Sequence, residues 1–113
     1  QIVRGVMAYT KAANMDPFSV EAISKLGDSL MKEGDFEGAA QTLETLVILT
    51  QDETTALLRL ASVYAGLSRY CDALSMLQKA RDKETDPARA ASLDTSIRKV
   101  SESCRSARPA PHP

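Results

Sequence analysis

Apolar residues recur three and four positions apart along most of this chain, which is the spacing of one face of an α-helix. No segment alternates apolar and polar residues over the length of a β-strand. The pattern therefore predicts an all-α protein. The predicted helices cover residues 2–15, 19–33, 36–49, 53–65, 69–83 and 86–104.

The same pattern of large and small residues returns after 34 positions. The large residues Ile2, Phe36 and Tyr70 are separated by this interval. Further sets with the same spacing are Gly5/Ala39/Ala73, Tyr9/Leu43/Leu77, Ala12/Leu46/Ala80, Ile23/Leu57, Leu26/Leu60, Gly27/Ala61 and Leu30/Tyr64. A fixed period of this length indicates stacked structural repeats, each of which needs a neighbour to bury its apolar face.

The period divides the chain into a repeat domain over residues 1–104 and a tail. The predicted units are a half repeat over 1–17, repeats over 20–53 and 54–85, and a capping helix over 86–104. Gly34 and Gly66 supply the permissive backbone of the turns inside the repeats, where Asp35 or Ser68 can cap the next helix. Asp86 is predicted to be the N-cap of the last helix, with Pro87 at its first position. Residues 105–113 are proline-rich and are predicted to be disordered. Because the sequence begins in the middle of a repeat, we expect it to be a piece of a longer chain.

These residues resemble the tetratricopeptide repeat family, whose unit of 34 residues is a pair of antiparallel helices. The resemblance implies an α-solenoid of about two and a half repeats and a C-terminal capping helix. It places Gly27 against Ala39, and Ala61 against Ala73, where the helices cross closely. The first complete unit carries the pattern as Ile23, Leu26, Gly27, Leu30, Ala39, Leu43 and Leu46, and the second as Leu57, Leu60, Ala61, Tyr64, Ala73, Leu77 and Ala80. Both units lack the family's tryptophan, and Gln51 and Thr85 replace its closing proline.

In this family the first helices of successive units line a concave groove that binds a partner. By resemblance, the groove residues here are Lys25, Asp28, Lys32, Arg59 and Ser62, with Arg89 and Arg98 on the capping helix. The segment 33–58 contains six acids and no base, and its helix is expected on the convex side. A basic groove with an acidic back would favour an acidic peptide, mainly through orientation and encounter rate. The alternative interpretation is that these cations are solvated and pair with neighbouring acids.

Some family members bind the C-terminal carboxylates of large heat-shock chaperones through a lysine and two asparagines. This chain has Ser24, Asp28 and Arg59 at the matching positions. Because a carboxylate at Asp28 would repel the carboxylate of the ligand, the sequence argues against this role.

Composition argues against several classes of function. The formal net charge is −1 and few residues are aromatic, so no nucleic-acid partner is expected, and no segment is apolar enough to span a membrane. Cys71 and Cys104 lack a C-x-x-C spacing and are interpreted as free thiols in a reducing, cytoplasmic compartment. His112 lies in the tail, and no metal site, cofactor motif or catalytic arrangement is expected.

The leading hypothesis is a non-enzymatic scaffold or adaptor that binds a peptide or helix of another protein. One alternative is an architectural C-terminal end of a longer superhelix in the assembly of a multi-subunit complex. Another is a docking appendage of an enzyme. Self-association is also expected, because Ile2, Val6 and Tyr9 lack the helix that would cover them.

Overall fold

The computed structural model describes residues 10, 11, 15 and 19–107, and within these ranges the chain is all helical. The helices lie within a few residues of the predicted boundaries, which confirms the all-α repeat fold. They are α2 (Val20–Glu33), α3 (Phe36–Leu49), α4 (Thr54–Gly66), α5 (Tyr70–Lys83) and α6 (Pro87–Ala107). The predicted first half repeat, with its proposed self-association surface, and the end of the tail from residue 108 lie outside the described residues.

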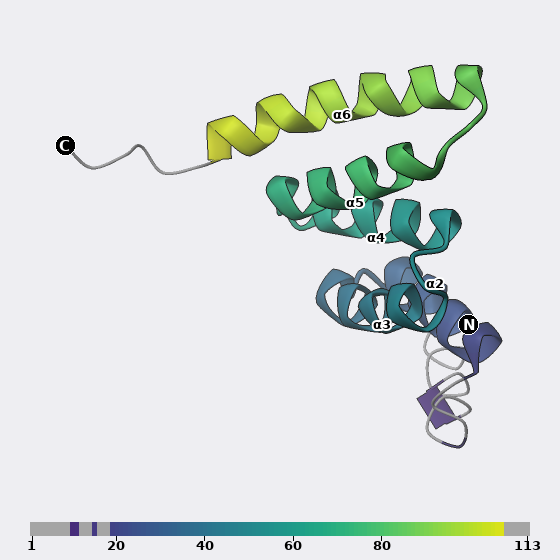
Figure 1. Cartoon of the computed structure of the whole chain (residues 1–113). Helices are drawn as coiled ribbons and strands as arrows, with labels where there is room; N and C mark the ends of the chain where they lie inside the picture. Colours follow the sequence, from purple (N-terminus) through teal and green to yellow (C-terminus); the bar gives the residue numbers. More distant parts are fainter. Residues whose placement is uncertain (1–9, 12–14, 16–18, 108–113) are drawn as a thin grey trace.

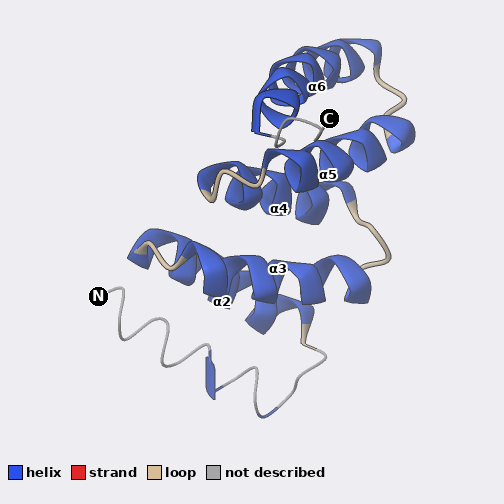
Figure 2. Cartoon of the chain, turned by 90° about the vertical axis from the view of Figure 1, so that its left-hand side faces the viewer, coloured by secondary structure: helices blue, strands red, loops and turns tan. Residues whose placement is uncertain are grey.

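The helices stack in the order of the chain. Helix α2 packs on α3 and α4 packs on α5, each pair joined by a short turn, while α3 also packs on α4. Helix α6 packs on α5 and runs back along it from the connecting loop (Figure 1). The side view shows three successive layers, α2 with α3, α4 with α5, and then α6 (Figure 2). The sixth helix therefore takes the place that the first helix of a further unit would occupy.

Residues at the helix ends explain most of the boundaries. Gly34 follows α2 with a φ of 88°, a left-handed conformation that glycine adopts without steric cost. The Asp35 carboxylate accepts a hydrogen bond of 2.9 Å from the Gly38 amide and so caps α3, as predicted. Asp86 caps α6 in the same way, by accepting a hydrogen bond of 3.0 Å from the Arg89 amide.

The turn of the second unit differs from the prediction. Gly66 is the last residue of α4, and it is Ser68 that takes the left-handed conformation, with a φ of 60°. Ser68 does not cap α5, because the N-cap residue is Arg69 and no side chain bonds to the free amides there. Ser68 stands 34 residues after Gly34, so the period itself identifies the equivalent turn position.

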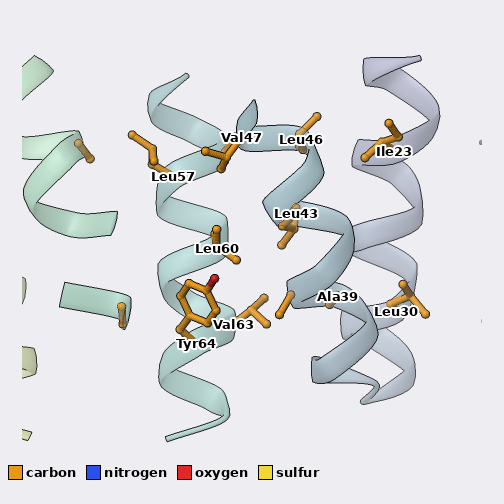
Figure 3. Close-up of a cluster of buried hydrophobic side chains, with 14 residues drawn as sticks. Ile23, Leu30, Ala39, Leu43, Leu46, Val47, Leu57, Leu60, Val63 and Tyr64 are labelled. Atoms are coloured by element: carbon orange, nitrogen blue, oxygen red, sulfur yellow. The ribbon is translucent and has the colours of Figure 1, made fainter. Parts of the chain in front are cut away.

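A continuous apolar core runs through the stacked helices (Figure 3). Its largest fully buried side chains are Leu43, Leu57, Leu60 and Val63, which come from α3 and α4. Ala39 and Ala73 are completely buried, as expected for small residues inside the pairs. Gly27 is tightly packed as well, although its closest neighbour is Leu43 and not Ala39: a Cβ at Gly27 would lie 3.0 Å from Leu43 Cδ2.

A lysine side chain forms hydrogen bonds to the loop that connects the two complete units. Gln51 and Asp52, which lie near the position of the family's closing proline, both have positive φ angles, 55° and 62°. Lys83 Nζ, at the end of α5, donates hydrogen bonds to the carbonyl oxygens of Gln51 at 3.2 Å and Asp52 at 2.5 Å. A cation from the following unit thus stabilises the carbonyl-rich exit of α3.

The interpretation of the cysteines as free thiols is wrong. Cys71 and Cys104 form a disulfide, with their Cα atoms 4.7 Å apart. The two residues are 33 positions apart in the chain, and only the antiparallel return of α6 along α5 brings them together. Helix α6 also continues to Ala107, so the predicted tail begins at least three residues later than expected.

Candidate partner-binding face

Helices α2, α4 and α6 form one side of the described stack, which we call the α2–α4–α6 face. Arg59 connects α4 to α2 through a hydrogen bond of 2.6 Å from its Nη1 to Ser24 Oγ. On its other side α4 meets α6 across a cavity. This is the face on which the family resemblance placed the groove.

The cavity between α4 and α6 has a volume of about 360 Å³ and a mostly apolar lining. Residues of α4 and α6 form its two walls, and Leu77 of α5 contributes from between them. The lining residues are Leu58, Ala61, Ser62, Ala65, Leu77, Leu93, Ser96 and Val100. Because it is open to solvent and apolar, this hollow offers a place for an apolar side chain of a partner.

Helical spacing produces both walls. Leu58, Ser62 and Ala65 are separated by four and three residues, so their side chains project from one face of α4. The same spacing aligns Leu93, Ser96 and Val100 on α6. The apolar stripe of α6 has two roles, because Leu93 and Val100 also pack against the core.

Two ion pairs lie on the α2–α4–α6 face. Asp28 Oδ1 lies 3.5 Å from Arg59 Nη1, so this carboxylate and the Ser24 hydroxyl both hold the guanidinium. Lys25 Nζ lies 2.9 Å from Glu21 Oε1, and the hydrogen bond and charge of Lys25 lower the pKa of Glu21. Lys25 and Arg59 are therefore engaged within the chain, as the solvated interpretation expected.

The structure distributes the remaining predicted groove residues over several environments. Ser62 lines the cavity, and Lys32 is exposed in the last turn of α2. Arg89 is exposed at the start of α6, where it lies 3.3 Å from Glu84 and 3.8 Å from Asp86. Arg98 stands two residues after Ser96, about 200° around the helix, and so projects away from the cavity.

Sequence reasoning missed most of the apolar lining. It includes Leu77 only as a position of the repeat pattern, and its predicted groove residues do not include Leu93 or Val100. A signal is present in α6, because Ala90, Leu93, Ile97, Val100 and Cys104 form one apolar stripe, and Leu93 and Val100 lie together at one edge of it. Which edge of this stripe stays open depends on the position of α4.

A second polar cluster lies where α3 meets α4, away from the cavity. The buried Tyr64 donates a hydrogen bond of 2.6 Å from its hydroxyl to Glu44 Oε2. Burial, together with this hydrogen bond and the charge of Glu44, raises the pKa of Tyr64 to about 12. The guanidinium of Arg69 lies 4.4 Å from the centre of the Tyr64 ring and is bonded to Asp72. Glu44, one of the six acids of the segment 33–58, thus connects two helices.

Comparison with known proteins identifies the family. The family model of the tetratricopeptide repeat matches residues 30–97, which is more than half of the chain. The protein therefore belongs to the tetratricopeptide repeat family. A search of curated proteins finds no significant sequence match.

Solved structures of tetratricopeptide repeat domains share the fold. The domain of Sgt2 from Aspergillus fumigatus superimposes with a TM-score of 0.73 at 22% identity, covering 99% of this chain and 76% of that one. The first such domain of Spaghetti (RPAP3), bound to the HSP90 peptide SRMEEVD, gives 0.73 at 17% identity, covering 88% and 77%. The TPR2B domain of yeast Sti1, in complex with pHsp70, gives 0.68 at 22% identity, covering 91% and 82%.

No helix within the described ranges has both the length and the apolar character needed to cross a membrane.

Proposed function

We propose that this chain is a protein-interaction module that binds a peptide or helix of a partner protein on the α2–α4–α6 face. The observation that carries the proposal is the apolar cavity between α4 and α6. Two of the structurally similar domains carry peptides or segments of chaperones, which supports the same use of the fold here. The proposed activity is binding without chemistry.

The lining of the cavity suggests what the partner presents. An aliphatic side chain of the partner would pack against Leu58, Leu93 and Val100. Ser62 and Ser96, one on each wall, offer hydroxyl groups to the partner's backbone or to a polar side chain. We propose this apolar anchor as the main source of affinity, because buried apolar contacts at the centre of an interface dominate binding.

The charged groove residues have a secondary role in the proposal. Lys25, Asp28, Lys32, Arg59 and Arg89 surround or flank the face, and the cations among them favour acidic residues beside the anchor. Arg59 is already bonded to Ser24 and Asp28, so a partner carboxylate would compete with groups of the same chain. Charge then affects encounter and orientation more than final affinity.

We do not propose recognition of a chaperone C-terminal carboxylate. That role needs amide and ammonium donors at this position, whereas Asp28 places a carboxylate 3.5 Å from Arg59. A ligand carboxylate there would meet a like charge, which opposes binding of the ionised group. The similarity to domains that bind chaperone peptides is thus a similarity of fold.

The proposal can be tested by selecting peptides from a random display library on the purified chain. Selected peptides should then be titrated against Ser62→Arg, which places a long charged side chain at the cavity. Ser62 is exposed, so this variant should fold. Binding should weaken by at least about tenfold, since loss of a contact at the centre of an interface costs about 2 kcal/mol or more, and about 1.4 kcal/mol corresponds to tenfold.

Ser75→Arg is the matched control. Ser75 is exposed on α5, on the side opposite the buried Ala73, and receives the same change of size and charge. Its affinity for the selected peptides should stay within about twofold of that of the unmodified chain. Equal binding by both variants would place the interaction elsewhere and refute the proposed site.

The disulfide also bears on the cellular location of the protein. A cytoplasmic location was expected from free thiols, and that basis is lost because Cys71 and Cys104 form a disulfide. Stable disulfides are typical of oxidising compartments.

The architectural alternative depends on an uncovered first helix, and the enzyme-appendage alternative depends on a catalytic domain that is not part of this sequence. Nothing in residues 19–107 favours either of them over partner binding.

A further inference from the structure

Helix α6 is held to the rest of the molecule by few buried side chains. Of its 21 residues only Ala90 and Cys104 are buried, and Leu93 and Val100 are partly buried against the core. The shorter helix α3, by comparison, buries five residues among its 14. The apolar attachment of α6 is therefore small for its length, and any additional restraint has a large effect on its position.

Two covalent restraints hold the ends of α6. At its start, the short segment Glu84–Asp86 joins it to α5. Near its end, Cys104 is bonded to Cys71, which is the second residue of α5. The disulfide thus closes α5 and α6 into a hairpin. Figure 1 shows α6 returning along α5.

The α6 wall of the cavity lies between these two restraints. Leu93, Ser96 and Val100 all follow the connecting segment and precede Cys104. The position of this wall relative to Leu58 and Ser62 consequently depends on how firmly α6 rests on α5. A change at the disulfide would alter the cavity without touching any residue that lines it.

We propose that the Cys71–Cys104 disulfide is a redox latch, which keeps α6 docked and the cavity formed until a dithiol reductant opens it. In the reduced chain, the part of α6 beyond Asp94 separates from α5 and the cavity loses one wall. The first part of α6 stays near α5 through the connecting segment and the ion pair of 2.8 Å between Arg81 and Asp94. Because both partners of that pair are substantially exposed, it holds α6 only weakly.

The bond can be reached by a reductant from the side of Cys71. Cys104 is buried, but Cys71 is only half-buried. An open hollow nearby is lined by Tyr70 and Ser103, the residues that precede the two cysteines in the chain, together with Glu102, Ser106 and Ala107. A thiolate of the dithiol attacks Sγ of Cys71, and Cys104 leaves as a thiolate that takes up a proton.

The second thiol of the reductant then completes the exchange. As a thiolate, it attacks the reductant's other sulfur atom, which is bonded to Cys71 in the mixed disulfide. Cys71 then leaves as a thiolate and takes up a proton. Two electrons and two protons pass to the chain, and the dithiol becomes a disulfide. The latched form belongs to oxidising surroundings and the open form to reducing ones.

Hydrogen exchange followed by mass spectrometry tests the latch without any ligand. The intact chain is compared before and after dithiothreitol treatment, with alkylation of two thiols per chain as proof of complete reduction. After reduction, amides of residues 97–107 should exchange roughly 10- to 100-fold faster, because the restraint that opposed local opening is gone. Amides of α2 and α3 should change by less than about twofold.

A double variant, Cys71→Ala/Cys104→Ala, separates the bond from the reagent. Without reductant it should show the fast exchange of the reduced chain in α6, and dithiothreitol should then have no further effect. Three results would overturn the proposal: unchanged protection of α6 in the fully reduced chain, a uniform loss of protection in all helices, or two thiols that remain alkylatable after the chain has been exposed to an oxidant. Since none of these readouts involves a partner, the outcome is independent of the proposed binding function.

Discussion

At the scale of single residues, the contact between Tyr64 and Glu44 shows how a family position acquires a specific role. The aromatic ring fills the core at a place where the repeat pattern requires a large side chain. Its hydroxyl would be costly to bury without a partner, and Glu44 accepts its hydrogen bond from the neighbouring helix α3. The pattern explains the ring, whereas the structure explains the hydroxyl.

Tyr64→Phe should destabilise the chain by about 1 to 2 kcal/mol, because a buried donor to a charged acceptor is lost while the ring remains. Glu44 is only partly buried and can be solvated, which keeps the cost moderate. Denaturant unfolding at neutral pH measures the difference. A variant as stable as the unmodified chain would show that the hydrogen bond contributes no net stability.

The same residue predicts a dependence on alkaline pH. Its pKa is about 12 in the folded chain, above the ordinary value of 10.0, so the protonated form is favoured by folding. The corresponding stability is fully present below pH 10 and is lost as the pH rises through 12. The stability advantage of the unmodified chain over Tyr64→Phe should therefore shrink between pH 10 and 12. An advantage that is constant over this range would contradict the raised pKa.

At the scale of elements, equivalent turns of the two units solve the same backbone problem with different residues. Gly34 and Ser68 both have positive φ angles, 88° and 60°, at positions one period apart. A residue with a Cβ is sterically disfavoured in this conformation, whereas glycine is not. The second turn is thus the more strained of the two.

Exchanging the residue types should shift stability in opposite directions. Ser68→Gly should stabilise the chain by about 0.5 to 1 kcal/mol, since it removes the penalty of a positive φ, and Gly34→Ser should destabilise it by about 1 kcal/mol. A Cβ at Gly34 would meet only open space, so no clash complicates the second variant. Thermal melts followed by circular dichroism give both values, and shifts of the same sign would contradict the argument.

At the scale of the whole molecule, the formal net charge of −1 is close to zero. The positions of the charges therefore affect ligand binding more than their sum does. Lys32 is exposed at the end of α2, beside the proposed binding face, while Lys79 is exposed on α5. Charges near a binding site act on a ligand over about 8 to 10 Å at physiological ionic strength. Only the first lysine should influence a bound acidic peptide.

Lys32→Glu should therefore weaken binding of an acidic peptide selected on the chain by about three- to tenfold, an effect that added salt reduces. Lys79→Glu changes the net charge by the same amount and sign, and is expected to alter the affinity less than about twofold. Titrations at low and high salt compare the two variants. Equal losses would indicate an effect of net charge alone.

The sequence by itself determined the helices, their order and most of the core. Helix positions follow from apolar spacing, and repeated small residues such as Ala39 and Ala73 follow from a period that every stacked unit must satisfy. These features depend on local geometry that is the same in each repeat. For that reason most of the buried residues of α2 to α5 could be predicted from the repeat pattern.

Tertiary structure alone decided which distant groups meet. The Cys71–Cys104 disulfide, the bonds of Arg59 to Ser24 and the cavity between α4 and α6 each join residues about 30 or more positions apart. Helical periodicity states on which side of its own helix a residue lies, but not the angle and distance at which two helices pack. Those quantities result from the combined fit of many side chains. They bring together two cysteines that were expected to be free thiols, and they leave an apolar cavity between α4 and α6.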